Sequence, residues 1–163
     1  METITDRAGI QSPLGLRAAL AVAENYHKRE LFNDEYLKWW EISLQYKTGQ
    51  IAKDALLGMA ASKHAIYNRH PEEKRAFYDP ANLRTAKTHY QDFVERYPQD
   101  AEKLGTNQVI KQIEEQLAEK ELVIAQYYDR TVHVQAANLY YDMVLQDYPQ
   151  TDAAEAARQS RSF

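Results

Sequence analysis

The chain has 163 residues and a mass of 18.9 kDa, enough for one domain with a proper core or for a short repeat array. Hydrophobic residues make up 44% and charged residues 27%, which is typical of a globular protein and argues against a disordered one. The net charge of −4 argues against a protein that binds nucleic acid, and the absence of cysteine excludes disulfides, thiolate metal sites and a cysteine nucleophile.

The sequence shows neither a membrane-spanning segment nor a signal peptide. The longest apolar run, residues 18–23, has six residues, against the roughly 20 that a spanning helix needs. Residues 1–12 carry no basic cluster and lead into no apolar run, so they predict a flexible polar arm. A signal for export or lipidation, if the protein has one, lies outside the printed sequence.

Helical patterns fill almost all of the chain from residue 13 to 163, which we expect to form a single domain. Ser12 and Pro13 predict a helix start, and apolar residues three or four apart continue the pattern to about residue 29. A second helix is expected from about 33 to 47, and a third from about 50 to 67. The third helix is rich in small residues, which let a neighbouring helix approach closely.

The second half of the chain continues in the same way after one long loop at residues 68–79. Asp79 and Pro80 predict the start of a fourth helix that ends at Pro98. A fifth is expected from about 101 to 128, which a break near Gly105 could divide, and a sixth from about 132 to 148. Thr151 can cap a short last helix. Because strand alternation appears nowhere, the sequence predicts an all-α fold.

One pattern recurs three times at a constant step of 51 residues. Each copy has an aromatic residue, then a large apolar residue, then a tyrosine: Trp39, Ile42 and Tyr46; Tyr90, Phe93 and Tyr97; Tyr141, Val144 and Tyr148. The third copy also fits the tetratricopeptide pattern, with Ala137 four residues before its aromatic. The first copy departs from it, with Glu35 at the alanine position. The sequence therefore predicts a tandem helix-turn-helix solenoid of about six or seven helices in a right-handed superhelix.

These overlong repeats resemble those of the BamD family of outer-membrane β-barrel assembly lipoproteins. The resemblance runs from about residue 21 to 158 and is carried by residues 86–98 (AKTHYQDFVERYP) and 118–157. The family carries a lipidated cysteine and more repeats, so this chain is expected to be a truncated or shortened relative.

The resemblance implies a non-enzymatic scaffold in the periplasm, associated with the outer membrane through a lipid anchor or a partner. Its partners would be BamA-like periplasmic domains, unfolded outer-membrane protein segments, or both. The alternative is a generic tetratricopeptide adaptor with another protein partner, cytoplasmic or periplasmic.

Signals of catalysis are weak in this sequence. It has no Gly-x-Ser-x-Gly motif and no glycine-rich phosphate loop. Glu24 and His27 have the Glu-x-x-His spacing of di-iron helical bundles, but such a site needs two of these motifs and two more glutamates. We expect no cofactor, no metal and no small-molecule substrate, with a di-iron enzyme as the alternative from another class.

Candidate partner-binding residues follow from the resemblance, which implies that the first helix of each pair lines an inner groove. Counted from the crossing points Ala23 and Ala125, the groove-facing positions are Arg17, Leu20, Glu24 and His27 in the first copy and Glu119, Leu122, Gln126 and Asp129 in the third. Such a mixed polar groove suits an extended or helical peptide. Trp40 is a further candidate, because it points about 100° away from the packing residue Trp39. The alternatives are an ordinary solvated face and, for Trp40, packing against the next helix pair.

Overall fold

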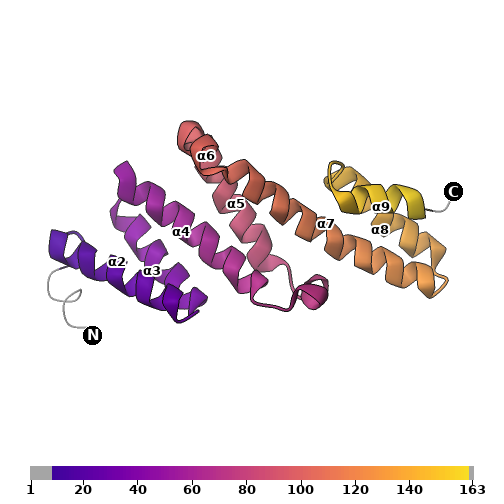
Figure 1. Cartoon of the computed structure of the whole chain (residues 1–163), viewed down its shortest axis with the longest axis horizontal. Coiled ribbons are helices and arrows are strands. Elements are labelled where there is room, and N and C mark those ends of the chain that lie inside the picture. Colours follow the sequence, from indigo (N-terminus) through magenta and orange to yellow (C-terminus); the bar gives the residue numbers. More distant parts are fainter. Residues whose placement is uncertain (1–8, 162–163) are drawn as a thin grey trace. The chain divides into compact units, whose positions relative to one another are not determined.

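A computed structural model describes residues 9–161 of the chain (Figure 1). Every regular element in this range is a helix, which confirms the all-α prediction. In chain order the elements are α2 (Pro13–Lys28), α3 (Phe32–Gln45), α4 (Gly49–Asn68), the 3-10 helix η1 (Glu72–Phe77), α5 (Ala81–Arg96), α6 (Pro98–Leu104), α7 (Thr106–Arg130), α8 (Val134–Asp147) and α9 (Asp152–Ser160). The expected loop at 68–79 thus contains a short helix of its own.

The chain divides into two compact units. The first unit holds the residues up to 69 together with 81–106, and the second holds residues 70–80 together with the chain from 107 onward. The single domain expected from residue 13 onward stays a prediction.

Local signals set the helix boundaries where the sequence predicts them. The Ser12 hydroxyl accepts a hydrogen bond from the Gly15 amide at 2.9 Å at the start of α2. The Thr151 hydroxyl does the same for Ala154 at the start of α9, at 3.1 Å. Gly105 adopts a left-handed conformation (φ 67°), which favours glycine, and so divides the expected fifth helix into α6 and α7.

Residues 9–12 differ from the flexible arm predicted for residues 1–12. Ile10 is buried against Ala19 and Ile42, and its carbonyl accepts a hydrogen bond from the Tyr46 hydroxyl at 3.1 Å. The prediction is therefore wrong for the end of the arm, while residues 1–8 lie outside the described residues.

In the first unit, α3 packs against both α2 and α4, and α4 packs against α5 (Figure 1). Trp39 contacts two buried clusters, one around Ile42 and one around Phe93. Gly58 on α4 lies directly under the Trp39 ring, so closely that a Cβ at this position would overlap the indole. The close approach that the small residues of this helix predict is confirmed at Gly58.

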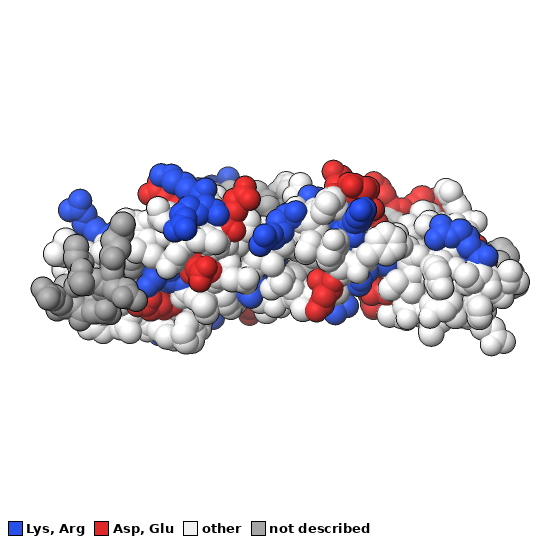
Figure 2. All heavy atoms as spheres, turned by 90° about the horizontal axis from the view of Figure 1, so that it is seen from below, with Lys and Arg blue, Asp and Glu red and all other residues white. Residues whose placement is uncertain are grey.

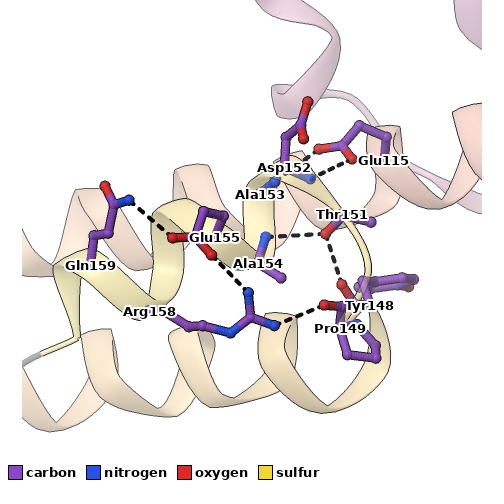
Figure 3. Close-up of polar contacts among 10 residues, drawn as sticks. All are labelled: Glu115, Tyr148, Pro149, Thr151, Asp152, Ala153, Ala154, Glu155, Arg158 and Gln159. Carbon is purple, nitrogen blue, oxygen red and sulfur yellow. Dashed lines mark hydrogen bonds and ion pairs between the residues drawn. The ribbon is translucent and has the colours of Figure 1, made fainter.

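In the second unit, α7, α8 and α9 share one core built on small side chains. Fully or almost fully buried alanines contributed by all three helices surround Tyr141 and Val144: Ala118, Ala125, Ala137, Ala153, Ala154 and Ala157. Glu115 of α7 joins α9 to this core, because its carboxylate accepts the amides of Asp152 and Ala153 at 2.8 and 2.9 Å (Figure 3). An anionic side chain from one helix thus satisfies the amino end of another.

Backbone hydrogen bonds and turn conformations recur at matching positions of the sequence repeat. The three repeat tyrosines each donate their backbone amide to the repeat residue four positions earlier, at 2.9–3.0 Å: Tyr46 to Ile42, Tyr97 to Phe93 and Tyr148 to Val144. The turns α2–α3 and α7–α8 also match, since Glu30 and Val132, two repeat steps apart, are the non-glycine residues with positive φ (56° and 61°) in the described range. The fold is therefore a series of tetratricopeptide-like helix hairpins.

Candidate partner-binding surfaces

Four predicted residues follow one face of α2, at spacings of three and four positions. Arg17, Glu24 and His27 are exposed, and Leu20 is half-buried against the core of the first unit. The Glu24 carboxylate pairs with Lys28 at 2.6 Å, and this hydrogen bond lowers the pKa of Glu24 below its ordinary value. The α2 face is therefore charged along its solvent side and apolar where it meets the core.

His27 on this face is held by a buried carboxylate of α3. Its Nδ1 lies 3.1 and 3.2 Å from the two carboxylate oxygens of Glu35, whose side chain is only 7% exposed, while His27 is 63% exposed. The same carboxylate accepts a hydrogen bond from the Trp39 indole at 3.3 Å. Because Nδ1 faces Glu35, Nε2 is the ring nitrogen left for a partner outside.

Trp40 is 48% exposed, which confirms that it lies outside the core seam that Trp39 occupies. It belongs to an exposed apolar stripe that was not predicted, because Leu37 and Leu44 are also 57% and 46% exposed. These three residues are spaced three and four apart, which places them on one side of α3. The signal was present in the sequence as a second apolar stripe beside the one that contains Ile42.

The four candidates on α7 do not share one environment. Glu119 and Asp129 are exposed and Gln126 is half-buried, but Leu122 is 9% exposed and packs in the core of the second unit. The prediction that Leu122 faces a groove is wrong. Leu122 follows Ala118 by four positions and precedes Ala125 by three, so it lies on the face of α7 that packs against the rest of this core.

A groove in the second unit was not predicted at all. It has a volume of about 380 Å³ and is lined by the end of η1 and by α7: Ala76, Phe77, Lys120, Val123, Ile124, Tyr127, Tyr128 and Arg130. We call it the η1–α7 groove. Phe77 and Tyr127 are 73% and 56% exposed. η1 and α7 are far apart in the sequence and meet only through tertiary contacts. The spacing of residues along α7 alone therefore could not predict the groove.

The charged surface does not separate by sign. On the face drawn in Figure 2, acidic and basic side chains are interspersed rather than gathered into one patch of either sign. Within residues 9–161, no group of three or more histidine and carboxylate side chains is placed to hold a metal ion. None of the helices in this range is both long enough and apolar enough to cross a membrane.

The fold defines the class of protein, an all-helical repeat protein built of tetratricopeptide-like hairpins. Residues 55–160, close to two thirds of the chain, match the family model YfiO, described as outer membrane lipoprotein. The chain therefore belongs to the YfiO family of outer membrane lipoproteins, in agreement with the resemblance to BamD. No curated protein matches the chain.

Proposed function

We propose that the protein is a non-enzymatic scaffold of outer-membrane protein assembly that works on the periplasmic side of the outer membrane. The observation that carries this proposal is the family match over residues 55–160. The resemblance to BamD supplies the partners, which are the periplasmic domains of a BamA-like protein, unfolded outer-membrane protein segments, or both.

The mechanism is binding on preformed surfaces, without bond chemistry. The α2 face and the stripe around Trp40 lie on helices that the core of the first unit holds in place. A surface that is already ordered loses little conformational entropy when it binds. The contact candidates are Arg17, Leu20, Glu24, His27 and Trp40 in the first unit and Glu119, Gln126 and Asp129 in the second.

Crosslinking in living cells tests this proposal. A photoreactive amino acid replaces Trp40, His27 or Glu119 in turn, and Gln91, exposed on α5 and outside every candidate surface, is the control position. The proposal predicts adducts with the BamA-like protein or with outer-membrane proteins from at least one candidate position, and none from Gln91. Adducts with other proteins alone would contradict the assembly role and favour a generic adaptor.

A further inference from the structure

The η1–α7 groove has a wall that is fixed before any ligand arrives. Lys120 of α7 donates from Nζ to the carbonyl oxygens of Ala76 and Tyr78, each at 2.9 Å. The His70 ring stacks on Tyr78 with 3.6 Å between centroids, and the Arg75 side chain donates to the His70 carbonyl at 2.9 Å. These contacts close the loop and tie it to α7, so the groove does not depend on a partner for its shape.

The lining of the groove is mostly apolar and its aromatic rings remain in solvent. Phe77 from η1 is 73% exposed and Tyr127 from α7 is 56% exposed, whereas Val123 and Ile124 are half-buried beside them. These aromatic side chains are exposed to water beside a hollow of about 380 Å³. Covering them with an apolar side chain removes apolar surface from water, which favours binding. The groove therefore favours an occupant with at least one large apolar side chain.

The charges of the lining residues have one sign. Lys120 and Arg130 are the charged residues that line the groove, and both are cations. The ammonium of Lys120 is engaged by the two loop carbonyls, whereas Arg130 is exposed at the carboxyl end of α7. The nearby Asp129 is not part of the lining. A carboxylate on the occupant would therefore meet Arg130 without a competing acid among the lining residues.

From these observations we propose that the η1–α7 groove docks an internal acidic and apolar segment of a protein partner. An apolar side chain of the segment lies against Phe77 and Tyr127, and an Asp or Glu side chain next to it pairs with Arg130. The proposal deepens the proposed function and rests on it in one respect, namely that the natural source of the segment is an assembly partner.

Blocked synthetic peptides test the groove without any assembly factor. The probe is an acetylated and amidated peptide with one leucine and one phenylalanine flanked by two glutamates. A second peptide has glutamines in place of the glutamates, and a third is the glutamine peptide with a free terminal carboxylate after the phenylalanine. Each is titrated into the whole 163-residue chain labelled with ¹⁵N. We expect shifts in the amides of residues 72–78 and 120–130, and about tenfold tighter binding of the glutamate peptide than of the glutamine peptide.

Variants locate the contact and separate its two parts. Arg130→Gln is expected to remove the preference for glutamate, and Phe77→Ser to weaken all three peptides. Leu139→Ser, which changes an apolar residue that is 60% exposed on α8 and outside the lining, is the matched control and is expected to change nothing. Equal binding of the first two peptides, tightest binding of the third, or shifts outside the groove would each overturn the proposal.

The outcome is independent of the proposed assembly role. If peptide binding fails while the chain still binds a BamA-like domain, the groove proposal is overturned and the proposed function stands. If peptide binding succeeds while no assembly partner binds, the groove is supported and the assembly role fails.

Discussion

The imidazole of His27 and the carboxylate of Glu35 join α2 to α3, with Nδ1 and Oε2 3.1 Å apart. Glu35 occupies the repeat position at which the other two copies have the fully or almost fully buried Ala86 and Ala137. Burying a carboxylate costs free energy unless hydrogen bonds compensate, and here His27 and Trp39 supply them. The departure of the first copy from the repeat is thus a specific polar link within the first hairpin.

Removing this carboxylate is expected to destabilise the protein through Trp39. In Glu35→Ala the indole N–H loses its acceptor, which costs about 1–2 kcal/mol of unfolding free energy. Phe has no N–H to leave unpaired, so Glu35→Ala is expected to cost about 1 kcal/mol less in a Trp39→Phe background. Urea unfolding of the two single variants and the double variant measures this coupling. Glu24→Ala combined with Trp39→Phe is the additive control, and additivity in both pairs would show that the Glu35–Trp39 bond contributes nothing.

Gly58→Ala is expected to destabilise the protein, although replacing glycine by alanine usually stabilises a helix. Replacing glycine by alanine within a helix usually raises the free energy of unfolding by about 1 kcal/mol. A Cβ at residue 58, however, would collide with the Trp39 ring. Gly58→Ala should therefore lower the free energy of unfolding by about 1–3 kcal/mol. Adding Trp39→Leu to the same chain should restore most of this loss. Thermal and urea unfolding check this. Stabilisation by Gly58→Ala in the wild-type background would show that α3 and α4 are not so close.

The cap that Glu115 places on α9 predicts a local effect. Glu115→Gln weakens the charge-assisted bonds to the amides of Asp152 and Ala153, at a cost of about 1 kcal/mol. Hydrogen exchange at residues 152–154 should speed up by more than exchange elsewhere. Glu119→Gln, one turn further along α7 and exposed, is the control. Equal hydrogen-exchange rates at residues 152–154 in the two variants would contradict the capping role of Glu115.

The positive φ of Val132 predicts a stabilising substitution. A β-branched side chain is strained in the left-handed region, and Val132 is 82% exposed, so its side chain gains little from packing. Val132→Gly is expected to raise the unfolding free energy by about 1 kcal/mol. Glu30→Gly, at the matching turn of the first hairpin, should change stability in the same direction. A loss of stability in both variants would contradict the assigned turn geometry.

Features that rest on neighbouring residues could be predicted from the sequence. Ser12 and Thr151 mark helix starts because their hydroxyls bond amides three positions later. Ile42, Phe93 and Val144 hold the same position in the three copies of the repeat and are all buried, because similar hairpins bury the same position of each unit.

Features that depend on distant residues were missed. Ile10 is anchored by the hydroxyl of Tyr46, and the η1–α7 groove exists because Lys120 holds a loop that lies more than forty residues earlier. Leu122 was misplaced because counting from Ala125 gives spacing along a helix, but not which side of α7 the neighbouring helices cover. Predicting a partner surface requires knowing which side of each helix its neighbours cover.

Titration calorimetry of the chain against the soluble periplasmic domains of a BamA homologue from the same organism tests the proposed assembly role without any other component. We expect binding at micromolar affinity or tighter, with a weaker affinity for Trp40→Ala or for variants of the α2 face. Absence of binding by a chain that circular dichroism shows to be folded and helical would contradict the assembly role.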